Sequence, residues 1–337
     1  MGESDTHIRN AINRGLIPGP RLFVATKVLA STGSYEPRTE SEHTCLPTGG
    51  EAVDGVESAR VAVRRRIAAG ADVIKFFADY RRRVMRYPPL QQHPYIPNVL
   101  HLPAEPNPDI LVFEQAEMDM IVSEAKLAKC PVACHAGTIE GAIMAVKAGA
   151  STIEHAYFGN DGLYNAMRDS GCVFVPTLTV CEVLHAKRYG EIRVQAKRAH
   201  ELGVRLACGG DIGICLLPNM RIANMKLINV GPVHHGANAR EMELMVDAGI
   251  PIEDVLEACT VGGWESVGKE LCGLKFGWFE EGARADIIAL ATDPRQDKLA
   301  MRKVEFVMKD AQVWKMDGKA VNMVQDNFEW PETFRTL

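Results

Sequence analysis

V-A-C-H-A (132–136) and S-T-I-E-H-A (151–156) are short, apolar runs typical of β-strands, and each carries one histidine near its carboxyl end. Between them, T-I-E-G-A-I-M-A-V-K-A-G predicts a helix that begins at Thr138 and ends at Gly149. The predicted unit is therefore strand, helix, strand. It places His135 and His155 at the same end of two neighbouring strands.

The same alternation continues on both sides of this unit. Helical spacing of apolar residues predicts further helices that begin near 5, 54 and 114, lie around 163–167, and span 182–202. The predicted strands between them are 21–28, 71–78, 172–178 and 203–211. Strands that alternate with helices in this way predict an α/β fold with a parallel sheet and right-handed crossovers.

Two segments depart from this rhythm. Residues 79–113 contain seven prolines and the basic, aromatic string D-Y-R-R-R-V-M-R-Y, so we expect a lid loop there. From about residue 270 the pattern changes to short strands separated by turns. We therefore expect a main domain over 1–269 and a small β appendage over 270–337.

The composition excludes several classes of protein. The chain has 337 residues, 47% of them hydrophobic and 24% charged, with a net charge of −5, which gives no reason to expect a nucleic-acid or anionic-membrane partner. It has no signal-peptide pattern and no apolar run of roughly 18 residues. Its nine cysteines lack a disulfide framework. We therefore expect a cytoplasmic protein with reduced cysteines.

Four side chains lie at or near the carboxyl ends of predicted strands, where parallel sheets and barrels bind ligands: Lys75, His135, His155 and Asp211. A single histidine in such a strand is more often a hydrogen-bonded core or rim residue. Two histidines on consecutive strands, with an aspartate on a third, favour a metal site. Lys75 has two interpretations. In the first, its aliphatic chain packs beneath the mouth, the open end of the sheet where the strands' carboxyl ends meet, and its ammonium lies in solvent. In the second, the amine is converted to a carbamate, because an ammonium has no lone pair with which to bind a metal.

The order I-K, H-A-G, I-E-H, G-G-D resembles the metal-dependent amidohydrolase superfamily. The closer likeness is to its branch of imidazolonepropionase-like proteins, prolidase-like carboxypeptidases and ochratoxin-type amidases. Further phrases that carry the resemblance are G-L-I-P-G-P-R-L, A-G-A-S-T-I-E-H-A, H-G-A-N-A-R-E-M-E-L-M-V-D-A-G and E-G-A-R-A-D-I-I-A-L. The resemblance implies a TIM-barrel-like amidohydrolase fold in which residues 1–269 form the catalytic domain.

The resemblance also implies the roles of the site residues. Lys75 would be a carboxylated ligand that bridges two metals, His135 and His155 would bind the second metal, and Asp211 would bind the first metal and act as general base. One or two divalent ions, zinc above all, would activate water to hydrolyse an amide or peptide-like C–N bond in a small-molecule substrate.

Three residues are candidates for substrate binding. His235 lies in the long loop beyond Asp211, and Tyr80 and Arg81 begin the expected lid, where they would hold a carboxylate. The alternative for Tyr80 and Arg81 is a solvated loop without a role in binding.

The sequence departs from the family at its first metal position, because none of its ten histidines forms an H-x-H pair. The expected barrel is N-terminally incomplete, with about six of eight strands, and its exposed edges predict a homo-oligomer. Three hypotheses remain open: an active C–N hydrolase, a non-catalytic protein with the same fold, and a truncated form of a longer enzyme. A lyase or lactonase that uses the same site is a further alternative.

Overall fold

The computed structural model describes residues 3–34, 49–81, 108–212, 233 and 236–322. Its centre is a parallel sheet of six strands in the order β2-β1-β3-β6-β7-β8. The strands are β1 (Val28–Ala30), β2 (Gly50–Ala52), β3 (Ile74–Phe77), β6 (Val132–Ala136), β7 (Thr152–His155) and β8 (Val173–Val175). The α/β fold with a six-stranded parallel sheet is therefore confirmed.

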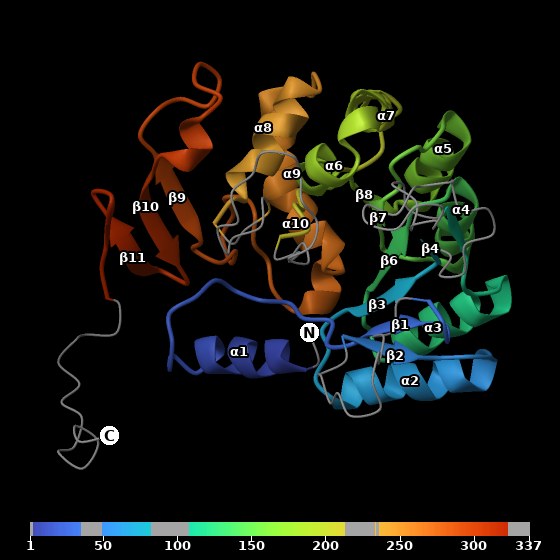
Figure 1. Cartoon of the computed structure of the whole chain (residues 1–337). Helices are drawn as coiled ribbons and strands as arrows, with labels where there is room; N and C mark the ends of the chain where they lie inside the picture. The colour runs from blue at the N-terminus through green and yellow to red at the C-terminus, as the bar shows by residue number, and fades with distance from the viewer. Residues whose placement is uncertain (1–2, 35–48, 82–107, 213–232, 234–235, 323–337) are drawn as a thin grey trace, which may run out of the picture.

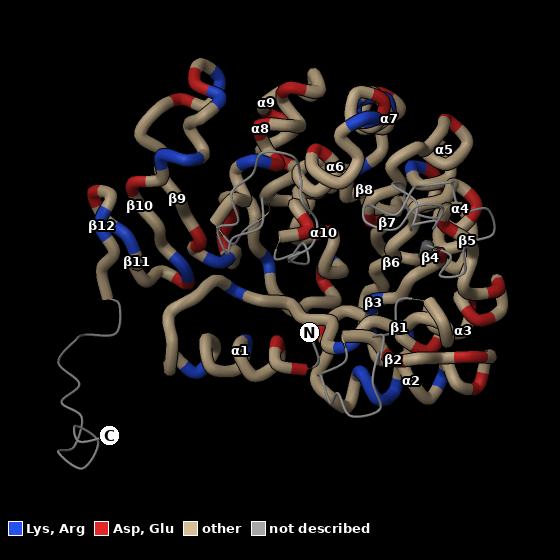
Figure 2. Tube along the Cα trace, in the orientation of Figure 1, with Lys and Arg blue, Asp and Glu red and all other residues tan. Residues whose placement is uncertain are grey.

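Helices pack along the outer side of this sheet (Figure 1). They are α2 (Val56–Ala68), α3 (Gln115–Leu127), α4 (Ile139–Ala148), α5 (Asp161–Ser170) and α7 (Tyr189–Glu201). Their inward faces form the hydrophobic core with the strands, and Met118, Ile121 and Val122 of α3 are at most 1% exposed. Figure 2 shows that Lys and Arg alternate with Asp and Glu along the chain.

The unit from β6 to β7 forms as its sequence predicts. The Thr138 side chain accepts a hydrogen bond from the Gly141 amide at 3.0 Å and so caps the first turn of α4. Gly149 ends the helix with φ 94°, a left-handed conformation that glycine adopts without strain. Local capping therefore sets both ends of the helix that separates the two histidine strands.

The strand expected over 21–28 is largely wrong, because only its last residue belongs to β1. Carboxylates replace strand neighbours along this segment: the Val24 amide donates to Asp72 at 2.9 Å, and the Thr26 amide donates to Asp5 at 2.9 Å. The sheet instead gains β2, which pairs with β1 in parallel.

Two other expected elements are shorter than predicted. In the run 203–211, the only sheet contact among the described residues is a parallel bridge from Leu206 to Phe174 of β8. The helix expected over 182–202 divides at His185, whose φ of −119° is not helical. It becomes α6 (Leu178–Leu184), a 3-10 turn (Ala186–Arg188) and α7.

The segment expected to be a lid begins and ends as a two-stranded antiparallel ribbon. Strand β4 (Asp79–Arg81) pairs with β5 (Asp109–Leu111), and Tyr80 lies opposite Ile110. Residues 82–107 between these strands lie outside the described part of the chain. The ribbon follows directly after β3, so it stands at the carboxyl end of the parallel sheet.

The C-terminal part of the described chain adds three helices and a second sheet. The helices are α8 (Ala239–Asp247), α9 (Ile252–Cys259) and α10 (Val261–Ser266). The sheet is antiparallel in the order β12-β11-β10-β9. Its strands are β9 (Ile287–Leu290), β10 (Val304–Lys309), β11 (Gln312–Met316) and β12 (Lys319–Ala320).

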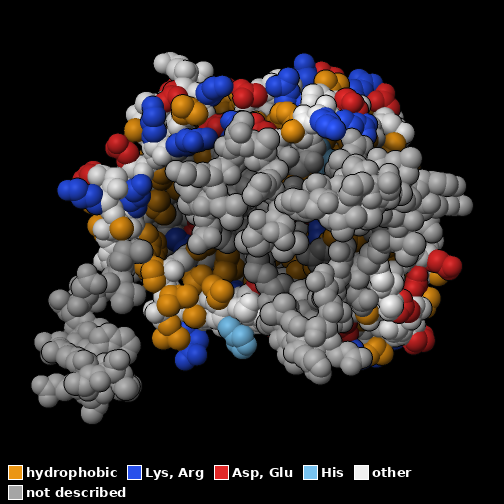
Figure 3. Space-filling view, in the orientation of Figure 1, with side chains coloured by type: hydrophobic (Ala, Val, Ile, Leu, Met, Phe, Trp, Pro, Cys, Tyr) orange, Lys and Arg blue, Asp and Glu red, His pale blue; other side chains and the backbone are white. Residues whose placement is uncertain are grey.

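None of the residues in these four strands is buried. Hydrophobic side chains accordingly gather at the lower left of Figure 3, where Figure 1 places this sheet next to α1 (Ser4–Asn13). No helix that the structure describes is long and apolar enough to cross a membrane.

Candidate active site

The strand register sets the heights of the expected site residues. His135 pairs with Phe77 on one side and with Glu154 on the other, while Lys75 lies two residues lower, level with Ala133. Two residues of strand span about 6.6 Å, a distance that the extended four-carbon side chain of a lysine can cover. Lys75 and His135 therefore point to the same side of the sheet, and the Lys75 head can reach the level of His135.

The two imidazoles lie next to each other. Their ring centroids are 4.6 Å apart and the rings are tilted by 66°. The register pairs His155 with Ala136 rather than with His135, so regular alternation would send the two side chains to opposite faces of the sheet. His155 instead has φ 78°, outside the range of a strand. We infer that this left-handed backbone turns its ring towards His135.

Thr177, directly after β8, fixes the orientation of the His155 ring. The His155 Nδ1 atom lies 2.7 Å from Thr177 Oγ1, which in turn donates its proton to the Pro176 carbonyl at 2.8 Å. Because this hydroxyl donates to the Pro176 carbonyl, we infer that His155 Nδ1–H donates to the threonine oxygen and that Nε2 keeps its lone pair. This tautomer is the one in which Nε2 can bind a metal.

Electrostatics lower the pKa of His155 and raise the pKa of Asp211. Burial, with the positive Lys75 and the neighbouring His185, holds the pKa of His155 well below its usual value. The Asp211 side chain still contacts solvent, yet desolvation raises its pKa and nearby Glu154 adds to the rise, while Lys75 opposes it. Lys75 therefore lies within electrostatic range of both His155 and Asp211.

Left-handed backbone recurs around this site. Besides His155, the non-glycine residues Ala156, Thr177 and Asp211 have φ of 39°, 52° and 50°. Such conformations cost roughly 1–3 kcal/mol each, and for the β-branched Thr177 they are rare. Strain of this kind is typical of residues held in position for a function, and here it follows the ends of β7 and β8 and the bridged segment that leads to Asp211.

The donor set suits a metal ion only with a contribution from Lys75. Among the described residues, no three His, Cys, Asp or Glu side chains are placed to hold one ion together. His135 and His155 supply two nitrogen donors, so a third donor of another type is needed. A carbamate on Lys75 would provide an oxygen there. Asp211 belongs to the same mouth but does not complete a three-residue cluster with the two histidines.

The structure also locates one of the three expected substrate-binding residues. The Tyr80 ring lies 6.3 Å from the His135 ring and 5.6 Å from the Phe77 ring, centroid to centroid, so it stands at the rim of the mouth. The side chain of Arg81 and the whole of His235 lie outside the described residues.

Asp79 attaches the ribbon that carries Tyr80 to the segment after His135. Its buried carboxylate accepts hydrogen bonds from the Gly137 amide at 2.7 Å, the Thr138 amide at 2.9 Å and the Thr138 hydroxyl at 2.5 Å. Burial nevertheless raises the pKa of Asp79. The ribbon is therefore fixed at its base by a residue that sequence patterns do not single out.

Glu241 of α8 supports the same mouth from the other side. Its carboxylate accepts hydrogen bonds from the Leu178 and Thr179 amides at 2.8 and 2.7 Å and from the Thr179 hydroxyl at 2.6 Å, which caps α6. Glu241 is 1% exposed, and burial raises its pKa to about 7. Neither Glu241 nor Thr177 had a recognisable signal in the sequence, because both act through contacts between distant segments or on strained backbone.

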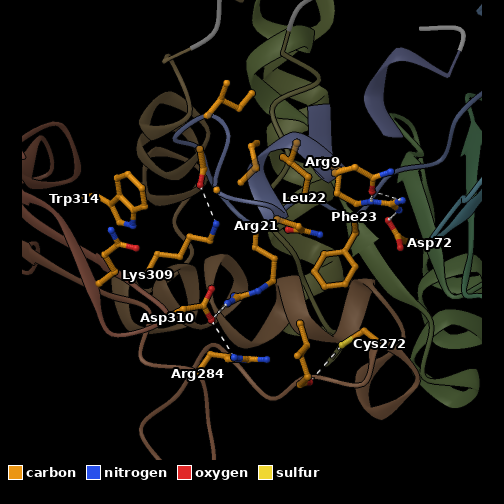
Figure 4. Close-up of a pocket in the computed structure, with 18 of the residues that line it drawn as sticks. Arg9, Arg21, Leu22, Phe23, Asp72, Cys272, Arg284, Lys309, Asp310 and Trp314 are labelled. Atoms are coloured by element: carbon orange, nitrogen blue, oxygen red, sulfur yellow. Dashed lines mark hydrogen bonds and ion pairs between the residues drawn. The ribbon is translucent and has the colours of Figure 1, made fainter. Parts of the chain in front are cut away.

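A cavity of about 920 Å³ lies away from this mouth, beside the amino-terminal end of β3. Its charged residues already have partners, since Arg9 pairs with Asp72, and Arg21 and Arg284 both approach Asp310 (Figure 4). It contains no histidine. The strand ends, rather than this cavity, therefore hold the chemistry.

Comparison with known proteins places these features in a family. The chain is 27% identical to ochratoxinase from Aspergillus niger over 332 residues, which cover 91% of this chain and 62% of that protein. It therefore spans less than two thirds of that relative's length. A solved Xaa-Pro dipeptidase with bound methionine is 26% identical, with a TM-score of 0.70, covering 93% of this chain and 73% of the dipeptidase.

The fold of the ochratoxinase itself is also similar. Its crystal structure has a TM-score of 0.74 at 24% identity, covering 98% of this chain and 74% of that one. Residues 1–321 match the amidohydrolase family, a range that includes all strands of both sheets. The chain therefore belongs to the amidohydrolase family.

Proposed function

We propose that the chain hydrolyses amide or peptide-like C–N bonds in small molecules. The observation that carries this proposal is the pair of adjacent imidazoles at the carboxyl ends of β6 and β7, with centroids 4.6 Å apart. Membership of the amidohydrolase family and the likeness to an ochratoxinase and a dipeptidase support the same bond class.

His135, Nε2 of His155 and a carbamate on Lys75 would hold a divalent ion, zinc in our proposal. When bound, such an ion would polarise the scissile carbonyl and acidify a water molecule. The Thr177 hydroxyl would keep His155 in the tautomer that binds metal, as its 2.7 Å contact with Nδ1 implies.

Asp211 would act as the general base and then as the general acid. It would take a proton from the attacking water and pass it to the leaving nitrogen, and its raised pKa suits a group that must carry a proton in each cycle. Tyr80 would contact the substrate from the rim. Arg81 and His235 remain proposals for the same task from the sequence alone.

The decisive experiment measures metal content and amide hydrolysis together. The whole chain and the variants His135→Ala and His155→Ala would be expressed with zinc and bicarbonate, analysed for bound metal, and assayed with a panel of N-acyl amino acids. We expect the chain to bind metal and hydrolyse members of the panel, and each variant to lose both properties.

A matched control is His200→Ala, because His200 lies on α7 and binds Asp254 at 2.9 Å, away from the mouth. It should keep metal and activity. Equal metal content in the wild type and the two site variants would contradict the ligand assignment.

One observation favours a second candidate, a non-catalytic amidohydrolase-fold protein. The described residues place no third His, Cys, Asp or Glu side chain with His135 and His155 to hold one ion. Bound metal without turnover of any member of the panel would support this candidate over the first.

A further inference from the structure

Two cysteines that are far apart in the sequence meet behind the segment that leads to Asp211. Cys208 follows the bridge residue Leu206, and its amide donates to the Ala258 carbonyl at 3.2 Å. Cys259 is the last residue of α9 and follows Ala258 directly, so the same backbone hydrogen bond brings it next to Cys208.

The backbones are also close together at this point. A Cβ added to Gly262 of α10 would lie 2.3 Å from the Leu206 carbonyl oxygen, so only glycine allows α10 to pack there. This close approach, with the Cys208–Ala258 hydrogen bond, keeps the two cysteine backbones near each other. Disulfides require Cα atoms roughly 4.4–6.8 Å apart, and a contact between backbones satisfies that need without a large movement.

We propose that Cys208 and Cys259 form a redox-modification site, in which a peroxide oxidant joins them in a disulfide that ties the segment before Asp211 to the end of α9. Both thiols are free and both residues are half-buried, so a small oxidant has access. Gly209 and Gly210 alone separate Cys208 from Asp211.

The chemistry has two balanced steps. Hydrogen peroxide oxidises the first thiol to a sulfenic acid and releases one water, and the second thiol then displaces hydroxide from that sulfur, which gives the disulfide and a second water. The neighbouring Cys259 thiol and burial both raise the pKa of Cys208 well above its usual value.

The test treats the purified full-length chain with increasing hydrogen peroxide at neutral pH, blocks free thiols by alkylation, and maps the peptides by mass spectrometry. We expect a Cys208–Cys259 cross-linked peptide that has lost two hydrogen atoms and that dithiothreitol restores. Cys259→Ser and Cys208→Ser should not form it. The control Cys272→Ser removes another half-buried free cysteine and should form it normally.

Two further measurements separate this proposal from non-specific oxidation. In Cys208→Ser, dimedone should label Cys259, because the sulfenic acid has no second thiol to react with. Closing a loop of about 50 residues should also raise the Tm of the oxidised wild type by about 3–6 °C.

The proposal fails if Cys208 and Cys259 remain open to alkylation at a peroxide concentration that oxidises Cys272, if either cysteine pairs with a different one, or if both end as sulfinic acids. None of these readouts depends on hydrolysis, so the outcome is independent of whether the proposed hydrolase function is correct.

Discussion

The carboxylate that caps α6 should make the stability of this protein fall as the pH rises. Glu241 is buried, and its pKa in the folded chain is raised from 4.5 to about 7. A carboxyl whose pKa is higher in the folded state binds more protons when folded, so stability is lost between the unfolded and the folded pKa. The perturbation that isolates this effect is Glu241→Gln, which keeps the shape and cannot ionise.

The magnitude follows from the shift in pKa. At about 1.4 kcal/mol per pKa unit, a rise from 4.5 to about 7 corresponds to about 3 kcal/mol. We therefore expect the unfolding free energy of the wild type, relative to Glu241→Gln, to fall by about 3 kcal/mol between pH 4.5 and pH 8. The steepest part of the fall should lie between pH 5 and pH 7.

The assay is urea unfolding followed by circular dichroism at a series of pH values for both proteins. Glu243→Gln is the matched control. Burial raises the pKa of Glu243, but hydrogen bonds from Arg302 and Arg240 outweigh burial and lower it overall. Its contribution should therefore be constant above about pH 4.5 and be lost only as the pH falls further.

A difference between wild type and Glu241→Gln that stays flat from pH 5 to pH 8 would refute this reasoning. It would mean that the three hydrogen bonds to the carboxylate from Leu178 and Thr179 compensate for its burial. A difference that grows with pH would mean that they exceed it.

Three further changes test other contacts. Thr177→Val keeps a β-branched side chain at φ 52° but removes the hydroxyl that orients His155. Metal titration should therefore show metal affinity lowered about 10- to 100-fold with the fold intact. Unchanged metal affinity would count against a role for the Thr177–His155 contact. Tyr164→Phe removes a buried hydroxyl that has no hydrogen-bond partner among the described residues, so urea unfolding should show equal or higher stability. Met118→Ala should cost about 2–5 kcal/mol in the same assay, whereas Val194→Ala, on a side chain that is 63% exposed, should stay within about 0.5 kcal/mol.

Local sequence signals were enough for much of the fold. The capping threonine and the final glycine of α4 and the two histidine strands all lie where their patterns indicated. These elements depend on neighbours in the sequence, or on burial that alternates regularly. The run 21–28 misled the prediction, because carboxylates of Asp5 and Asp72 bind its amides in place of a neighbouring strand.

The candidate active site was likewise predictable only in part. The positions of His135 and His155, at the carboxyl ends of neighbouring strands, followed from the periodicity of the sequence. The left-handed backbone of His155 could not be predicted, since no residue preference favours it there.

Arg21 connects the two ends of the chain, because its side chain pairs with Asp286 and with Asp310, which lie 265 and 289 residues further on. Phe23 stacks on Phe276 at 5.8 Å in the same region. During synthesis at about 5–20 residues per second, the segment around Arg21 therefore leaves the ribosome tens of seconds before its partners exist. For that interval Phe23 stays exposed on the nascent chain, where a chaperone can bind it, and this junction is among the last parts of the protein able to fold.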